Sequence, residues 1–105
     1  NLVITRSGAS VLGELINIKI PFISIPLPSS ADNHQYKNAE FYVKKGYGYL
    51  LEQKYIKNNL YDLINSIFYD KSSIEKILLN QEKYSDKYIF KNLNLQIEKI
   101  LNEKN

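Results

Sequence analysis

The sequence predicts an α/β domain built on a parallel sheet of about three strands. Three short runs, residues 2–5, 22–25 and 47–52, are rich in the β-branched and aromatic residues of buried strands. Segments with helical spacing of apolar residues separate these runs. Strands that alternate with helices imply parallel pairing through right-handed crossovers. Further helical spacing after residue 52 predicts a helical C-terminus.

The first strand and the first helix follow one another closely. Residues 2–5 are apolar and β-branched, which predicts a buried strand, and Ser7-Gly8-Ala9-Ser10 predicts a tight turn. A helix is then expected over residues 10–17. Its expected apolar face consists of Val11, Leu12, Leu15 and Ile18. Pro21 ends this segment, and residues 22–25 follow as a strand that is apolar on both faces.

A second helix is predicted over residues 32–45. The three prolines between positions 21 and 28 exclude a helix from the loop that precedes it. Asp32 is a residue type favoured at the N-cap, and Gln35 would complete a capping box with it. Gly46 suits the position just beyond the helix end. The residues expected to face the core are Tyr36, Ala39 and Val43.

Three sets of apolar residues at helical spacing follow the last predicted strand. They are Leu60, Leu63, Ile64 and Ile67, then Ile74, Ile77 and Leu78, then Phe90, Leu93, Ile97, Ile100 and Leu101. Three strands are few for a stable sheet, and the chain opens on Asn1, directly before a strand. We therefore expect residues 1–105 to be part of a larger domain. Alone, they should expose a sheet edge and be poorly soluble.

Composition argues against several classes of protein. The 105 residues carry a net charge of +3 and a pI of about 9.0 from scattered lysines, without the basic stripe of a nucleic-acid binder. With no Cys and one His, His34, the chain has no disulfide framework and no thiolate or multi-histidine metal site. The sequence has no signal peptide and no run of the roughly 18 apolar residues that a membrane helix needs. These features favour a cytoplasmic protein.

Arg6, Ser7, Gly8, Ala9 and Ser10 lie between the first predicted strand and the first predicted helix. Ligands of open α/β sheets bind at the carboxyl ends of the strands. A helix start at that edge offers free backbone N–H groups and the positive end of the helix dipole, which favour a phosphate. Glycine allows close approach of the backbone, and serine hydroxyls add donors. The segment therefore predicts a phosphate-binding turn.

Polar side chains near this turn suit the rest of a nucleotide sugar. Glu14 lies about one turn into the helix, where its carboxylate can accept hydrogen bonds from the two vicinal hydroxyls of a ribose. His34, Gln35 and Asn38 share a polar face at the start of the second helix, because they are three or four residues apart. Imidazole and amide groups donate and accept hydrogen bonds, which suits sugar hydroxyls.

Purely structural roles account for the same residues. Ser7 or Ser10 can cap a helix, Glu14 can be a solvated surface residue, and Asp32 with Gln35 can serve only as caps. The turn matches neither the Walker loop nor the G-x-G-x-x-G fingerprint. The chain contains no nucleophile elbow and no convincing Ser-His-Asp set. From these residues taken singly, a structural α/β module stays open.

In this order and spacing, the motifs together resemble those of family 28 glycosyltransferases over about residues 2–52. The matching segments are Ile4-Thr5-Arg6-Ser7-Gly8-Ala9-Ser10, Glu14-Leu15, Ile20-Pro21, Ile25-Pro26-Leu27-Pro28, Ala31-Asp32-Asn33-His34-Gln35, Asn38-Ala39 and Gly46. The later half of the chain resembles the family only in its helical pattern. The resemblance implies a GT-B fold of two Rossmann-like domains. Residues 1–105 would be the latter part of the C-terminal, donor-binding domain.

The resemblance also implies site residues for a UDP-N-acetylglucosamine donor. Those that would meet the nucleotide and the diphosphate are Ser7, Gly8, Ala9, Ser10 and Val11. Glu14 would bind the ribose hydroxyls, and Arg6 would lie near the cleft. Gln35, with His34 and Asn38, would face the N-acetylglucosamine. The family often has Thr at the position of Val11, so a hydroxyl contact would be lost, and some members have Gln at the position of His34.

The implied reaction is an inverting sugar transfer that uses no cofactor and no protein-bound metal, with UDP as the leaving group. The implied acceptor is undecaprenyl-diphospho-muramoylpentapeptide, bound by an N-terminal domain outside this sequence, at the cytoplasmic surface of the membrane. No catalytic residue is assigned to residues 1–105, and no nucleic acid is expected as a partner. Two alternatives stay open: a different lipid acceptor such as diacylglycerol, and a donor-binding subunit that pairs with a separate partner.

Overall fold

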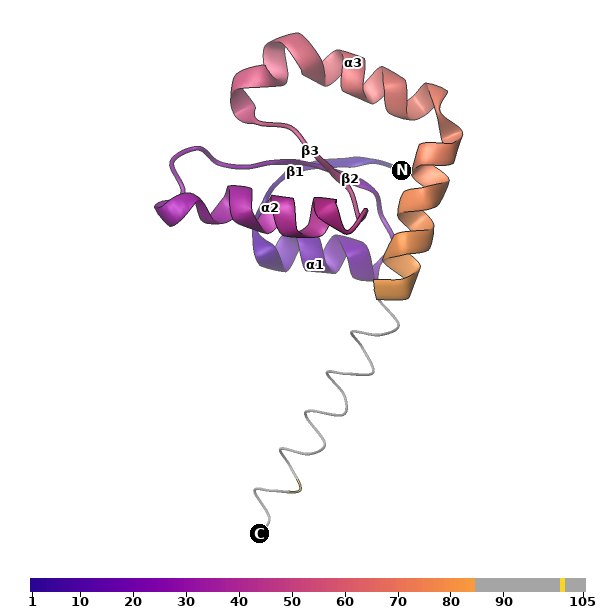
Figure 1. Ribbon diagram of the computed structural model, residues 1–105, viewed down its shortest axis with the longest axis horizontal. Coiled ribbons are helices and arrows are strands. Elements are labelled where there is room, and N and C mark those ends of the chain that lie inside the picture. Colours follow the sequence, from indigo (N-terminus) through magenta and orange to yellow (C-terminus); the bar gives the residue numbers. More distant parts are fainter. Residues whose placement is uncertain (85–100, 102–105) are drawn as a thin grey trace.

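The computed structural model describes residues 1–84 and residue 101 (Figure 1). Its elements in chain order are β1 (Val3–Arg6), α1 (Ala9–Asn17), β2 (Phe22–Ile25), the 3₁₀ helix η1 (Ala31–Asn33), α2 (His34–Lys44), β3 (Tyr49–Leu50), the 3₁₀ helix η2 (Gln53–Tyr55) and α3 (Ile56–Tyr69). A further helix covers residues 71–84. The three strands form one parallel sheet in the order β1-β2-β3. The predicted α/β class and the parallel sheet are confirmed.

Helices cover the sheet from opposite sides. α1 and α2 lie on one face and α3 lies on the other (Figure 1). The buried cluster on the α1 side consists of Leu12, Ile16 and Phe22, and that on the α3 side of Ile23, Ile25, Leu51 and Ile67. All four residues of β2 are buried, as its apolar sequence predicted, because β2 is the central strand and has a helical layer on each side.

β1 is more exposed than the sequence predicted. Its residues alternate between half-buried and exposed, and the side chain of Ile4 is 46% exposed. Within the described residues β1 pairs with β2 alone, so its other edge faces solvent. The expectation of a fully buried first strand is therefore wrong, because an apolar sequence does not show whether a strand is central or lies at an edge.

The apolar face of α1 is centred on different residues from those predicted. Leu12 and Ile16 are fully buried, whereas Val11 is 42% and Ile18 62% exposed. Leu12 and Ile16 are four residues apart, so they lie above one another on the side that faces the sheet. Val11 lies in the first turn away from this side, and Ile18 follows the last helical residue. The expectation that these two residues pack in the core is wrong.

The start of α2 also differs from the prediction. Asp32 and Asn33 have φ values of 51° and 59°, and the N-cap residue Asn33 makes no side-chain cap bond. Asp and Asn tolerate this left-handed conformation better than most residues do. The backbone N–H of Gln35 donates to Oγ of Ser30 at 3.3 Å. The predicted capping box of Asp32 and Gln35 is therefore wrong, and the side chain of Gln35 is used elsewhere.

α2 ends as the sequence predicted. Gly46, with φ of 81°, lies just past the C-cap and donates its N–H to the carbonyl of Val43 at 2.9 Å. The N–H of Tyr47 donates to the carbonyl of Tyr42 at 3.2 Å. These two bonds form a Schellman motif. Because Tyr47 is committed to this cap, it does not join the sheet, and β3 is shorter than the six residues expected.

The two helical sets that follow β3 are confirmed. α3 packs Leu60, Leu63 and Ile64 against the core, and Ile74 of the next helix joins them. Ile77 is 6% exposed. The third predicted set, from Phe90, lies outside the described residues except for Leu101. No helix in the described part of the chain is both long and apolar enough to cross a membrane.

Candidate functional site

The candidate site lies at the edge of the sheet where the three strands end. β1 ends at Arg6, β2 leads through Ile25 into the proline-containing loop, and β3 leads into η2 at Gln53. Carboxyl ends of parallel strands all meet at one edge, so segments distant in the sequence come together there. The two helices that follow β1 and β2 both begin at this edge.

The N-terminus of α1 presents unpaired backbone donors. Gly8 is the N-cap residue, with an extended backbone (φ −67°, ψ 136°) and no side-chain cap bond. The first helical hydrogen bond runs from the N–H of Leu12 to the carbonyl of Gly8 at 3.0 Å. The N–H groups of Ala9, Ser10 and Val11 precede it and have no partner within the described residues. Neither Ser7 nor Ser10 caps this helix, so the N–H groups and the helix dipole face the space before α1.

Gly8 leaves the approach to these donors open. A methyl group built at Gly8 would meet only a methyl of Val11, at 3.9 Å. A side chain at this position would therefore project into open space in front of the helix. The backbone at Gly8 has a negative φ, so conformation does not require glycine here. The physical value of glycine at this position is the clear access that it gives a ligand to the helix N-terminus.

Three side-chain contacts hold the turn at Ser7 in place. Its N–H donates to Oε1 of Gln35 at 3.3 Å, and its carbonyl accepts from Nδ2 of Asn38 at 3.3 Å. Its hydroxyl is fully buried and pairs with the hydroxyl of Ser24. The N–H of Leu27 also donates to Oε1 of Gln35, at 2.8 Å. The start of α2 therefore fixes both the β1–α1 turn and the loop after β2.

These contacts leave specific groups of each residue available. The carbonyl oxygen of Gln35 already accepts two backbone N–H groups, so its Nε2 amide group remains as a donor. The amide nitrogen of Asn38 is engaged by the turn, and the hydroxyl of Ser7 faces the interior. The predicted proximity of the two helix starts is confirmed. The predicted contacts of these residues with a ligand remain predictions.

The remaining candidates lie on the surface around the turn. Glu14 is exposed on α1, and His34 is exposed at the first position of α2. Within the described residues the side chain of neither residue makes a hydrogen bond or an ion pair. Arg6 is also exposed, and its Nη1 donates to Oε1 of Gln53 at 2.7 Å. Away from this turn, burial raises the pKa of Tyr47, and the hydroxyl of Ser72 contributes most to lowering the pKa of Asp70.

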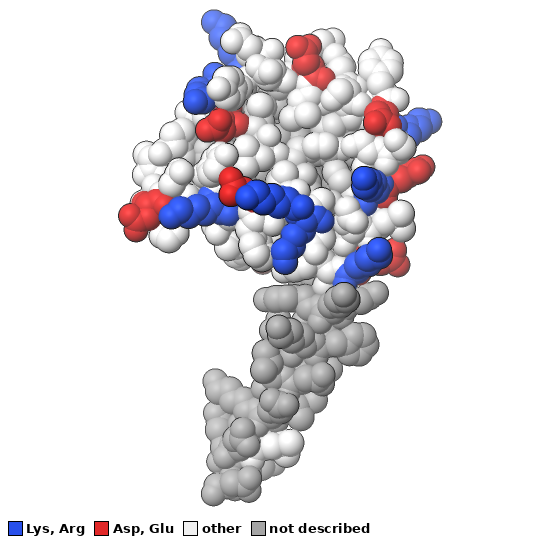
Figure 2. All heavy atoms as spheres, viewed as in Figure 1, with Lys and Arg blue, Asp and Glu red and all other residues white. Residues whose placement is uncertain are grey.

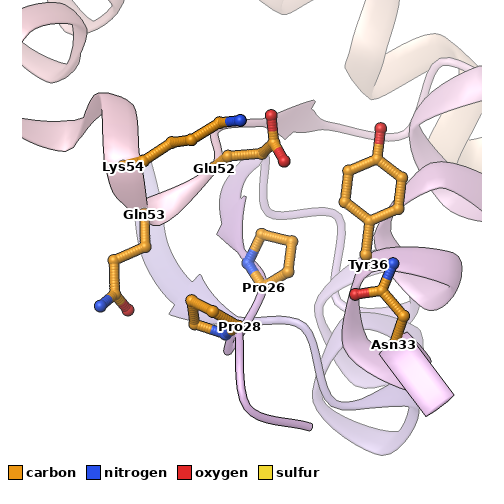
Figure 3. Close-up of a pocket in the computed structure, with 7 residues that line it drawn as sticks. All are labelled: Pro26, Pro28, Asn33, Tyr36, Glu52, Gln53 and Lys54. Atoms are coloured by element: carbon orange, nitrogen blue, oxygen red, sulfur yellow. The ribbon is translucent and has the colours of Figure 1, made fainter.

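A pocket of about 200 Å³ lies where the segments after β2 and β3 meet the start of α2 (Figure 3). Its lining residues are Pro26, Pro28, Asn33, Tyr36, Glu52, Gln53 and Lys54. None of the ten predicted site residues lines the pocket, but Gln53 joins it to Arg6. Sequence reasoning missed Ser24, Glu52 and Gln53. The position of residues 52 and 53 directly after the third strand was the available signal, because that end of a parallel strand faces the ligand edge.

The charged groups of the described residues form no metal-binding cluster. No group of three or more His, Cys, Asp or Glu side chains able to hold a metal ion occurs in that part of the chain. Basic and acidic side chains are interspersed on the face shown in Figure 2. The uncapped N-terminus of α1 and the exposed Arg6 lie at the same edge of the sheet, and both would attract an anion.

Comparisons with known proteins found a matching family model and several relatives. A family model described as the glycosyltransferase family 28 C-terminal domain matches residues 1–97. Three relatives share the name UDP-N-acetylglucosamine--N-acetylmuramyl-(pentapeptide) pyrophosphoryl-undecaprenol N-acetylglucosamine transferase. The Pelagibacter ubique protein is 42% identical over 105 residues, which cover 98% of this chain and 29% of that protein.

The other two relatives come from Rickettsia. The Rickettsia felis protein is 49% identical over 71 residues, covering 63% of this chain and 20% of that protein. The Rickettsia prowazekii protein is 45% identical over 87 residues, which cover 79% of this chain and 23% of that protein. The chain thus spans less than a third of the length of these relatives. A comparison with solved structures found no match. The family match over residues 1–97 confirms the predicted family, and the chain belongs to the glycosyltransferase family 28 C-terminal domain family.

Proposed function

We propose that this chain binds the UDP-N-acetylglucosamine donor of an inverting glycosyltransferase. The acceptor in this proposal is undecaprenyl-diphospho-muramoylpentapeptide, in line with the names of the relatives. The observation that carries the proposal is the uncapped N-terminus of α1, held in place through Ser7 by two side chains of α2. A pre-positioned set of backbone donors is what recognition of a diphosphate requires.

In this proposal the helix start binds the diphosphate and contributes to the chemistry. The N–H groups of Ala9, Ser10 and Val11 would donate to phosphate oxygens. As the bond to the sugar breaks, negative charge grows on the departing UDP, and donors that are already in position stabilise that charge without reorganising. The contacts that hold Ser7 serve this purpose because they keep the turn before α1 in one conformation.

The remaining predicted residues would recognise the nucleoside and the sugar. Glu14 would accept hydrogen bonds from the ribose hydroxyls. The free amide group of Gln35 would donate to an oxygen of the N-acetylglucosamine, and His34 lies next to it at the start of α2. We assign Asn38 to the support of the turn, since its amide is engaged there.

The acceptor side of the reaction is assigned to a second domain of the GT-B fold. A deprotonated hydroxyl of the acceptor would attack the anomeric carbon of the sugar, and UDP would leave with the bonding electrons. The general base and the acceptor-binding residues would come from that other domain. Because the acceptor is linked to a lipid, we propose that the enzyme works at the cytoplasmic face of the membrane, as a peripheral protein.

Calorimetric titration of UDP-N-acetylglucosamine tests this proposal. The protein is expressed with all further sequence that its gene encodes, as wild type, Glu14→Ala and Glu82→Ala. Glu82 is an exposed carboxylate on the distant helix 71–84 and serves as the control. We expect Glu14→Ala to weaken binding about tenfold, through loss of a charge-assisted contact, and Glu82→Ala to have no effect. Absence of binding by the wild type would refute the proposal, and equal binding by Glu14→Ala would remove Glu14 from the site.

A further inference from the structure

Arg6 and Gln53 connect the outer strands of the sheet at the candidate site. Nη1 of Arg6 donates to Oε1 of Gln53 at 2.7 Å, although 47 positions separate the two residues. Arg6 is the last residue of β1, and Gln53 is the first residue of η2, just after β3. The bond therefore spans the end of the central strand β2. It is the only hydrogen bond between side chains that joins β1 to the segment after β3 within the described residues.

The chemistry of this pair differs from that of an ion pair. Within the described residues Arg6 makes no ion pair; the single salt bridge there joins Lys44 to Glu40. Glutamine is neutral, so it restrains the guanidinium without cancelling its charge. One of the five N–H donors of the guanidinium is used, and four remain. An anion near Arg6 would thus meet a full positive charge on a side chain whose direction is already set.

Arg6 lies close in sequence to the helix start at which the diphosphate is proposed to bind. Arg6 directly precedes Ser7, whose backbone is held by Gln35 and Asn38, and Gly8 at the N-cap of α1 follows. A diphosphate on the N-terminus of α1 would lie within the reach of an arginine two residues before the N-cap. Guanidinium groups bind phosphate oxygens through pairs of parallel N–H donors, so the orientation of the group matters as much as its charge.

We propose that Gln53 is a positioning residue that holds the guanidinium of Arg6 toward the diphosphate of the donor. This inference rests on the proposed function, because it takes the diphosphate to bind at the start of α1. Removal of Gln53 leaves the charge of Arg6 in place but frees a long and flexible side chain, which must then be ordered when the ligand binds. Gln53 would therefore affect ligands with a diphosphate and leave the nucleoside alone unaffected.

A double-mutant cycle tests this coupling. UDP and uridine are each titrated into the wild type, Arg6→Ala, Gln53→Ala and the double variant, again in the complete product of the gene. We expect Gln53→Ala to weaken UDP binding about two- to fivefold, as for a solvent-exposed charged contact. Arg6→Ala should weaken it further, and the double variant should match Arg6→Ala alone. Binding of uridine should be the same in all four proteins.

Two further variants separate positioning from general disturbance. Asn58→Ala removes an exposed amide one turn further along, in α3, and should bind UDP as the wild type does. Gln53→Glu keeps the contact but pairs Arg6 with a carboxylate. It should therefore weaken UDP binding while leaving the melting temperature unchanged, and the loss should shrink as salt screens the pair.

The outcomes distinguish this inference from the proposed function. If the wild type fails to bind UDP, the donor site itself is refuted, and the role of Gln53 falls with it. If the wild type binds UDP but Gln53→Ala binds equally well, only the role of Gln53 is overturned. Additive losses in the double variant would also overturn it, because they would show that Gln53 acts independently of Arg6. An equal loss for uridine would overturn it as well, because the effect would then not act through the diphosphate.

Discussion

Gln35 shows how a single side chain can organise a site formed by three segments. Its carbonyl oxygen accepts the N–H of Ser7, after β1, and the N–H of Leu27, after β2. It lies in the first turn of α2, between the two loops. Without it, the part-buried N–H of Ser7 would lose its hydrogen-bond partner in the protein, and the exposed N–H of Leu27 would be left to solvent. The same side chain therefore supports the site through its oxygen and can contact a ligand through its nitrogen.

Replacing this amide in two ways separates its two roles. Gln35→Glu retains an oxygen acceptor for both N–H groups but removes the amide donor. We expect this variant to unfold at a temperature close to that of the wild type and to bind UDP more weakly, because its carboxylate would repel the diphosphate. Its affinity for UDP-N-acetylglucosamine should fall about tenfold more than its affinity for UDP, from loss of one hydrogen bond to the sugar. Calorimetric titration of both ligands measures this difference.

Gln35→Leu is the matching control, because it removes donor and acceptor together. It should lower the free energy of unfolding by about 1–3 kcal/mol, since two backbone N–H groups lose their acceptor. Urea titration measures the change. If Gln35→Glu lost affinity for UDP and UDP-N-acetylglucosamine equally, Gln35 would have no specific contact with the sugar.

At the scale of elements, the approach of β3 to β2 depends on a small residue. Gly48 is buried directly before β3, and a Cβ atom built there would lie 2.5 Å from the ring of Phe22. Phe22 is fully buried at the first position of β2, so its ring has little freedom to move. The two strands pack closely at this level because glycine has no side chain.

Alanine at two glycine positions tests this packing. Gly48→Ala should lower the free energy of unfolding by about 1–3 kcal/mol, as expected for overpacking of a rigid core. Gly13→Ala is the control: its Cβ would meet only the hydroxyl of Tyr42, at an ordinary 3.9 Å, in the middle of α1. That change should raise stability by up to about 1 kcal/mol through helix propensity. Equal stability of Gly48→Ala and the wild type in urea titration would show that Phe22 can move aside.

At the scale of the whole molecule, two surfaces differ in how they are covered. The α1 and α2 face is closed by a cluster of aromatic rings from Tyr42, Tyr47 and Tyr84. Gln81, fully buried, ties the helix over residues 71–84 to this end by donating to the carbonyls of Ile20 and Tyr47, at 2.9 and 2.8 Å. The helix after α3 therefore packs beside the sheet and closes its amino-terminal edge.

The second surface, beside the outer edge of β1, leaves apolar side chains exposed. Ile4 is 46% and Phe68 66% exposed. A cavity of about 320 Å³ extends over Leu2, Ile67 and Ile74 next to them. The free edge of β1 offers unpaired backbone groups to another chain. Residues 1–105 expressed alone should therefore associate with themselves.

A lysine on this edge tests that expectation. Ile4→Lys places a charge on the free strand and should raise the fraction of monomer in sedimentation velocity. Leu79→Lys adds the same charge at a residue that is 59% exposed on the distant helix, and it should change the fraction much less. A wild-type chain that stays monomeric across the concentration range would contradict the expectation, as would equal effects of the two lysines.

The sequence alone predicted those features that depend on residues close to one another along the chain. Apolar periodicity predicted the order of strands and helices, and Gly46 predicted the end of α2, because both depend on residues within one or two turns of each other. The strand–turn–helix pattern also indicated an anion site at the start of α1 and placed the two helix starts side by side. The family motif rests on the same short segments, which is why it too was readable before the fold was known.

Only the tertiary structure decided which polar groups meet. Ser7 is bound by Gln35 and Asn38, 28 and 31 positions away, and Arg6 by Gln53, 47 positions away. A local pattern cannot encode such pairs, since a capping box and a long-range contact use the same residue types. Gln35 makes the long-range contacts because two backbone N–H groups, one after β1 and one after β2, lie within hydrogen-bonding distance of its side-chain oxygen. The position of β1 at an edge was likewise set by the packing of the whole sheet, which an apolar run of residues does not reveal.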